Sequence, residues 1–297
     1  MICEGHTVRL FSVRGYWIRG CARCKHRYAE LVPAADHVRR IYGDDYFCGG
    51  GAGYSNYCGE AAVLRSRGNW YGRLLSSYLA GGLMLDVGCA AGFVLQGFRD
   101  CGWSGVGLEP NSSMAAYARS LGLTVESGVL EDLRTDLRFD LVSMIQVVAH
   151  FTDLRRAFAV TAALTKPGGY LLVETWNRES WTARLLGSAW HEYSPPSVLH
   201  WFSPGGLARF AAAFGFQEVA RGRPPKRISL DHAIALLKYR CGPSSIGRRA
   251  VQAISSSVDL ARVPRNLTIP YPGEDLFYAI YRKELTDSRH TAGGRTL

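Results

Sequence analysis

The sequence predicts a doubly wound α/β fold, in which a seven-stranded and mostly parallel sheet carries helices on both faces. Strand-like apolar runs alternate with helical segments from about residue 61 to residue 222, and this alternation is typical of parallel sheets. The run 139–145 is apolar at nearly every position, as in a strand that is buried on both faces. A glycine-rich turn at 88–92 directly follows another apolar run, and such folds bind ligands at that edge of the sheet.

The predicted elements begin with an amphipathic helix over 60–79, after which strands and helices alternate. The strands are predicted at 83–87, 104–108, 123–127, 139–145, 170–175, 216–221 and 276–281, and the later helices at 92–100, 111–121, 153–165 and 204–214. Asn111 and Ser203 stand where a helix begins, and side chains of this type cap helix N-termini. The last two strands follow the last covering helix, so we expect them to form an antiparallel pair.

The chain divides into three regions and a tail. Residues 1–60 are rich in Cys, Gly and Tyr and form an N-terminal arm, and residues 61–284 form the main domain. Within that domain, residues from about 223 to 268 predict a helical insertion, which would be either a lid over a ligand pocket or the surface of a homodimer. The tail from 285 to 297 is expected to be disordered.

The composition narrows the classes of protein and partner. The net charge is +10, and from residue 221 to the end there are 14 Lys and Arg against 6 Asp and Glu. This basic region would suit RNA or an acidic partner, but aromatic residues are not interleaved with the charges, so nucleic acid is the less favoured reading. No apolar run approaches the ~20 residues of a membrane span, and no signal segment begins the chain. We expect a cytoplasmic protein whose eight cysteines are reduced.

The first two predicted strands each end in a carboxylate, at Asp86 and Glu109. The small residues Gly88, Ala90 and Gly92 allow backbone N–H groups at the following helix to approach a ligand closely. Glu109 is placed to accept hydrogen bonds from a ribose diol. Asp86 would repel a pyrophosphate but attract an ammonium group. The pattern therefore favours S-adenosylmethionine over a dinucleotide.

These segments resemble the motifs of class I S-adenosylmethionine-dependent methyltransferases, which have a Rossmann-like fold. The matching runs are D-V-G-C-A-A-G at 86–92, L-E-P at 108–110 and K-P-G-G-Y at 166–170. The resemblance implies that Gly88, Ala90 and Gly92 approach the amino-acid part of the cofactor and that Glu109 binds the ribose. It further implies cofactor contacts for Asp86, Gln146 and Tyr57, and a place beside the adenine for Pro110 or Asn111.

Two positions depart from the patterns of related enzymes. Many relatives place an Asp after the third strand to contact the adenine amine, but this chain has Val129, so a backbone carbonyl or Glu131 is expected to serve. Ubiquinone-pathway O-methyltransferases read E-V-L-E-H after the fourth strand and can hold a divalent metal there. This chain reads Q-V-V-A-H at 146–150, without carboxylates, so a magnesium site is not expected.

Three histidines are the candidates for the chemistry. Transfer of a methyl group to a hydroxyl requires alignment of the acceptor and removal of a proton, and His is suited to that task near neutral pH. His150 follows the fourth strand at the rim where ligands bind in such folds. His191 and His200 lie in an aromatic-rich loop at 190–203 that follows the fifth strand. A structural role for each histidine is the alternative.

The N-terminal arm contains a candidate zinc site. Cys3, His6, Cys21 and Cys24 give the pattern C-x2-H…C-x2-C, which has the spacing of two metal-binding turns, and His26 is an alternative to His6. A short hairpin between Val8 and Ile18 would join the two turns. Zinc would stabilise a segment that is too small to form its own core.

The run Y-G-D-D-Y-F-C-G-G-G-A-G-Y-S-N-Y at 42–57 resembles a bacterial group of small-molecule methyltransferases with such an arm. In that arrangement Tyr54 and Tyr57 would close over the cofactor. The resemblance implies O-methylation of a natural product or a sugar-containing intermediate, with N- or C-methylation open. The alternatives are an rRNA or tRNA methyltransferase that uses the arm and the basic region, and a protein that binds the cofactor without transferring a methyl group.

Overall fold

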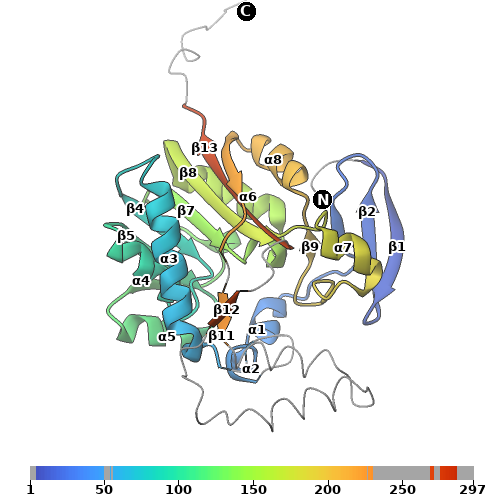
Figure 1. Ribbon diagram of the computed structural model, residues 1–297, viewed down its shortest axis with the longest axis horizontal. Coiled ribbons are helices and arrows are strands. Elements are labelled where there is room, and N and C mark those ends of the chain that lie inside the picture. The colour runs from blue at the N-terminus through green and yellow to red at the C-terminus, as the bar shows by residue number, and fades with distance from the viewer. Residues whose placement is uncertain are drawn as a thin grey trace, which may run out of the picture.

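Figure 1 shows the computed structural model, which describes residues 5–49, 54, 56–225, 227–229, 268–270 and 275–285. Cys3, nearly all of the predicted helical insertion and the tail from residue 286 lie outside the described residues. Among those that are described, no helix has both the length and the apolar content that crossing a bilayer requires.

The main sheet has seven strands in the order β10-β13-β8-β7-β4-β5-β6. The inner pairs are parallel, whereas β13 is antiparallel to both of its neighbours, β8 and β10. This confirms the predicted seven-stranded, mostly parallel sheet and its antiparallel final pair. The strands are β4 (Leu83–Val87), β5 (Ser104–Glu109), β6 (Thr124–Ser127), β7 (Phe139–Ile145), β8 (Thr165–Trp176), β10 (Phe216–Gly222) and β13 (Leu276–Lys283).

Helices cover both faces of the sheet, and each face has its own apolar core. One core receives side chains from α3, α4 and α5, and the other from α6 and α8. Asn111 and Ser203 accept bonds from the amides of Met114 and Gly206, which confirms them as helix caps. The helices are α3 (Ala61–Leu75), α4 (Phe93–Asp100), α5 (Ser112–Ser120), α6 (Leu154–Leu164) and α8 (Pro204–Ala212), with short 3-10 turns η1 (Cys58–Glu60), η2 (Leu130–Asp132) and η3 (Val148–His150).

Strand β8 begins five residues earlier than the sequence predicts. The K-P-G-G segment does not end the preceding element; it lies inside the strand, where the pairing with β7 shifts register between Phe139 and Leu141. Gly168 has a φ of +75°, which a residue with a side chain rarely adopts. The glycines therefore form a bulge in a long strand, which sequence periodicity reads as a turn.

The N-terminal arm forms a second sheet, which lies beside the main domain in Figure 1. The predicted hairpin is present as β1 (Thr7–Val13) and β2 (Tyr16–Cys21), followed by β3 (Arg27–Ala29). The fourth strand of this sheet is β9 (His200–Trp201), which comes from the loop after β8. The arm is thus joined to the loop that contains two of the three candidate histidines, His191 and His200.

Shorter elements complete the described fold. Helices α1 (His37–Ile41) and α2 (Asp44–Cys48) belong to the arm and lie between β3 and α3 along the chain. Helix α7 (Trp181–Leu186) with η4 (Gly187–Ala189) lies between β8 and the aromatic-rich loop. Strands β11 (Arg227–Ser229) and β12 (Thr268–Pro270) pair at the two sides of the undescribed insertion.

Candidate functional site

The glycine-rich turn after β4 adopts a backbone that few residue types permit. Gly88, Ala90 and Gly92 all have positive φ values, of +66°, +46° and +78°. A Cβ atom at position 88 would come within 2.7 Å of Val147 Cγ2. A side chain at position 88 would therefore displace Val147, which also lines the cavity. The sequence predicts a turn of this kind for the close approach of a cofactor.

Glu109 is held at the end of β5 by two backbone donors. Its Oε2 accepts from the Ala90 amide at 2.8 Å, and its Oε1 accepts from the Asn111 amide at 2.8 Å. The residue is 3% exposed, and burial raises the pKa of its carboxyl to about 7 although both amides favour the charged form. Each oxygen keeps a further lone pair, so the fixed carboxylate can accept bonds from a diol.

Two predicted cofactor residues lie behind the cavity wall. Asp86 is 3% exposed and accepts a bond from Ser143 Oγ at 2.6 Å. Burial raises the pKa of Asp86 to about 7, and the Glu109 carboxylate adds to this, while the Ser143 bond opposes it. A Cβ atom at Gly92 would come within 2.2 Å of Leu123 Cδ1. The glycine is therefore needed for close packing where α4 begins.

A cavity of about 290 Å³ opens at the carboxyl ends of the parallel strands. It brings together six of the eight predicted cofactor residues and two of the three candidate histidines. These are Gly88, Ala90, Glu109, Pro110, Gln146, Tyr57, His150 and His191. The topology thus places residues up to 134 positions apart in the chain around one volume, as the doubly wound fold predicts.

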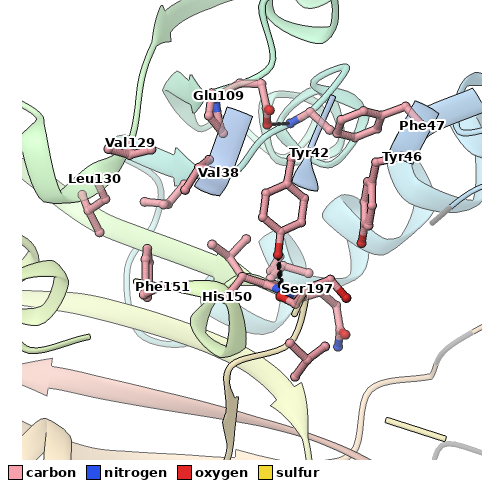
Figure 2. A pocket seen from close by; sticks show the side chains of 18 of the residues that line it. Val38, Tyr42, Tyr46, Phe47, Glu109, Val129, Leu130, His150, Phe151 and Ser197 are labelled. Carbon is pink, nitrogen blue, oxygen red and sulfur yellow. Dashed lines mark hydrogen bonds between the residues drawn. The ribbon is translucent and has the colours of Figure 1, made fainter. Parts of the chain in front are cut away.

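His150 is fixed on one side of this cavity (Figure 2). Its Nδ1 lies 2.8 Å from the carbonyl oxygen of Ser197 and 2.8 Å from Tyr42 Oη, which itself donates to the Ser197 carbonyl. Because a carbonyl can only accept, Nδ1 carries the proton and Nε2 is the basic nitrogen. Burial lowers the pKa of His150, opposed by the carbonyls of Ser197 and Gln146 and by the Glu192 carboxylate.

The other two histidines have different surroundings. His191 lines the cavity, and its Nε2 lies 2.6 Å from Glu192 Oε1. His200 does not line the cavity in the described part of the chain. Its Nδ1 pairs with His26 Nε2 at 3.1 Å, and its Nε2 pairs with the Phe151 carbonyl at 3.1 Å. Both nitrogens of His200 are therefore engaged in joining the arm to the main domain, and the structure favours the structural alternative for this residue.

Gln146 has a strained backbone at the cavity wall, with a φ of +62°. The backbone N–H of Gln146 donates to the backbone carbonyl of Glu174 at 2.9 Å, and the side-chain Nε2 of Gln146 donates to Glu174 Oε1 at 2.7 Å. Glu174 is fully buried and also accepts from Arg67 and from Tyr71 Oη. Since a carboxylate only accepts, the side-chain amide is oriented with Nε2 on Glu174, and this network was not predicted from the sequence.

Aromatic residues of the arm form another wall of the cavity. Tyr54 and Tyr57 line it, as the resemblance implied, and Tyr42 and Tyr46 line it as well. In Figure 2 the Tyr42 ring extends toward His150 and Ser197. The sequence did not single out Tyr42, although it begins the tyrosine-rich run that carries the resemblance.

The cavity wall after β6 has the predicted departure at position 129. Val129 lines the cavity, and so does Glu131, which is 7% exposed. Glu131 Oε1 accepts from Thr152 Oγ1 at 3.3 Å and from the Asp153 amide at 3.4 Å. A carboxylate is therefore present beside the valine, as the sequence analysis proposed.

The predicted zinc ligands are only partly described. Cys21 and Cys24 are buried, His6 is exposed, and Cys3 lies outside the described residues. Within the described ranges, no group of three or more His, Cys, Asp or Glu side chains is arranged to hold a metal ion. A metal site in the arm is thus not established by the structure.

The family profile described as "Methyltransferase domain" matches residues 70–220 of this chain. The match covers β4 to β10, including the glycine-rich turn, Glu109, His150 and His191. It therefore covers most of the cavity and leaves out the N-terminal arm.

Among curated proteins, the chain is 34% identical over 133 residues to a ubiquinone biosynthesis O-methyltransferase of Bradyrhizobium sp. (strain ORS 278), over 43% of this chain and 51% of that protein. It is 31% identical over 165 residues to a protein of the same name from Rhodopseudomonas palustris (strain BisA53), and this match covers 54% of this chain and 63% of that protein. The chain thus spans about half to two thirds of the length of these relatives.

Among solved structures, the fold resembles that of 1,6-didemethyltoxoflavin-N1-methyltransferase from Burkholderia thailandensis, crystallised with 1,6-didemethyltoxoflavin and S-adenosylhomocysteine. The TM-score is 0.52 at 15% identity, over 93% of this chain and 99% of that one. At this identity the likeness concerns the fold alone, and it agrees with the predicted class I methyltransferase architecture.

Proposed function

The chain belongs to the family of methyltransferase domains, and from this premise we propose that it transfers the methyl group of S-adenosylmethionine to an oxygen of a small molecule. The observation that carries the proposal is a single cavity with Glu109, fixed by two backbone amides, and the histidine His150. The first provides a site for a ribose, and the second a base within reach of the same volume.

The residues present fit this cofactor. Gly88 and Ala90 open the backbone at the methionine end, Glu109 accepts the ribose hydroxyls, and Val129 and Glu131 lie at the adenine end. When bound, the cofactor supplies an electrophilic methyl group on a positively charged sulfur. The protein's contribution is to hold an acceptor hydroxyl in line and to remove its proton.

We assign the base to His150 Nε2. The bond from Nδ1 to the Ser197 carbonyl fixes the ring and its tautomer, as an orienting group does for a catalytic histidine. A lowered pKa keeps the imidazole neutral at pH 7, and the nearby Glu192 carboxylate favours the charged form once a proton arrives. His191 is the alternative base, since it also lines the cavity.

The relatives' name supports a small-molecule acceptor and O-methylation. A natural product or a sugar-containing intermediate is our proposed acceptor class, as the sequence analysis expected. RNA is not favoured, because none of the described cavity-lining residues is Lys or Arg. The homodimer and the cytoplasmic location stay predictions.

The proposed function is tested by two measurements on the full chain. Isothermal titration should show binding of S-adenosylmethionine, and a panel of hydroxylated acceptors should yield S-adenosylhomocysteine with at least one member. Cofactor binding without product across the panel would instead support a cofactor-binding protein that does not transfer methyl groups.

Cofactor binding is expected to release protons near neutral pH. The free carboxyls of Asp86 and Glu109 have pKa values of about 7, and donors from a ribose together with a positively charged ligand favour their ionised forms. The affinity for S-adenosylmethionine should therefore fall as the pH drops below 7. Titrations at pH 6.5 in phosphate and in imidazole buffer, which differ in ionisation enthalpy, should differ in heat. Equal heats in the two buffers would contradict the prediction.

We also propose that the arm holds a structural zinc. The Cys24 amide lies 3.5 Å from Cys21 Sγ, and Lys25 closes the turn with a φ of +60°. An N–H group directed at a sulfur favours the thiolate that binds zinc. His26 is 3% exposed and its Nδ1 has no hydrogen-bond partner among the described residues, so it stays an alternative ligand to the exposed His6.

The zinc proposal predicts a simple metal stoichiometry. The purified protein should contain about one equivalent of zinc, and the double variant Cys21→Ser, Cys24→Ser should contain none. Elemental analysis by mass spectrometry measures this directly, with Cys101→Ser as a control for loss of a cysteine elsewhere. A parent protein without zinc would refute the proposal and leave the cofactor site unaffected.

A further inference from the structure

The charge of the cavity wall is opposite to that of the whole chain. Three of the described lining residues are glutamates, and none is Lys or Arg. The chain as a whole has 35 Lys and Arg against 25 Asp and Glu, so this wall does not follow from composition. A cavity lined by carboxyl groups and by no described Lys or Arg disfavours an anionic ligand and favours a neutral or cationic one.

Two of the three glutamates serve the end of the cavity assigned to the cofactor. Glu109 is held by its two amides, and Glu131 accepts from Thr152 and from the Asp153 amide beside the adenine position. Glu192 is the third, and no cofactor role is assigned to it. Its side chain is 12% exposed, and its partner is His191, which is charged only when protonated.

The position of Glu192 is fixed through its backbone. Its carbonyl oxygen accepts from Trp201 Nε1 at 2.7 Å and from the Ser194 amide at 2.8 Å. Burial raises the pKa of the Tyr46 and Tyr54 hydroxyls, and the Glu192 carboxylate adds to this, so Glu192 lies near the arm's side of the cavity. The rings of Tyr46, Tyr54 and Trp176 line the same cavity.

We propose that the methyl acceptor carries a protonated amine, which binds to the Glu192 carboxylate beside these aromatic rings. Aromatic faces attract organic cations, and a carboxylate that is largely removed from water gains most from an opposite charge. An acceptor with a carboxylate or phosphate would meet repulsion without a described basic side chain to offset it. This inference rests on the proposed function, because it treats the part of the cavity beside Glu192 as the acceptor site.

The test compares three catechols that differ in the charge of one side-chain terminus: dopamine, 4-propylcatechol and 3-(3,4-dihydroxyphenyl)propanoate. Each is titrated into the full protein saturated with S-adenosylhomocysteine. Dopamine should bind at least about tenfold more tightly than the propanoate, with the neutral compound between them. The isosteric variant Glu192→Gln should remove most of this difference. Glu179→Gln, which changes a more exposed carboxylate outside the cavity, should preserve it.

Equal or tighter binding of the anionic probe would overturn the inference, and so would failure of dopamine to bind. An unchanged preference in Glu192→Gln would also overturn it. A loss of S-adenosylmethionine affinity in Glu192→Gln would assign the carboxylate to the cofactor instead. Failure of the parent protein to bind S-adenosylmethionine would refute the proposed function, whereas cofactor binding combined with preference for the anion would refute only this inference.

Discussion

Replacement of His150 by alanine is expected to lower kcat about a hundredfold or more while leaving the affinity for S-adenosylmethionine nearly unchanged. The physical reason is that a neutral hydroxyl is a weak nucleophile and that the proposed base is removed. His150 Nε2 is the nitrogen available for the proton, because Nδ1 bonds to the Ser197 carbonyl. Single-turnover rates with saturating cofactor measure the effect on the chemical step.

The pH dependence gives this prediction a signature that a structural role would not produce. Burial lowers the pKa of His150, so the base stays unprotonated below the ordinary value near 6.5. With S-adenosylmethionine kept saturating at every pH, the acidic limb of the kcat/KM profile for the acceptor should therefore lie below pH 6.5 in the parent protein and disappear in His150→Ala. Tyr42→Phe removes only the hydroxyl beside Nδ1 and should have a much smaller effect.

His191→Ala serves as the matched comparison, because His191 lines the same cavity without the bond to Ser197. A near-normal rate in His150→Ala together with a hundredfold loss in His191→Ala would reverse the assignment. His200→Ala should retain the pH profile of the parent, since both of its nitrogens are engaged outside the cavity.

Replacement of Glu109 by alanine is expected to weaken S-adenosylmethionine binding at least about tenfold, or ~1.4 kcal/mol. The change removes the acceptor for the ribose hydroxyls and leaves the Ala90 and Asn111 amides without their partner. These amides fix the turn that approaches the cofactor, so the loss should exceed that of one hydrogen bond. Isothermal titration of the variant measures it.

Two further variants serve as comparisons for Glu109→Ala. Glu126→Ala removes an exposed carboxylate from the neighbouring strand β6 and should leave the titration unchanged. Glu109→Gln keeps one acceptor oxygen but places an NH₂ group against one of the two amides, so an intermediate loss is expected. A parent-like isotherm for Glu109→Ala would refute the assignment of the ribose site.

The sequence determined the main sheet and the glycine-rich turn at the edge where the cavity lies. The strand at 139–145 is mostly apolar, and the turn at 88–92 requires glycine at defined points, so both are specified by local residue types. Glu109 could be predicted as the ribose-binding residue because it directly follows a predicted apolar strand. Information of this kind is local, and a single sequence carries it well.

Only the tertiary structure decided which histidines share the cavity. His191 and His200 lie nine residues apart in one aromatic-rich loop, and their surroundings in the sequence are alike. His200 joins β9 to the N-terminal arm, whereas His191 lies beside Glu192 in the cavity wall. That difference arises from strand pairing between segments more than 170 residues apart, as in the 174-residue separation of His26 and His200. Sequence periodicity does not record such pairing, because it depends on long-range packing.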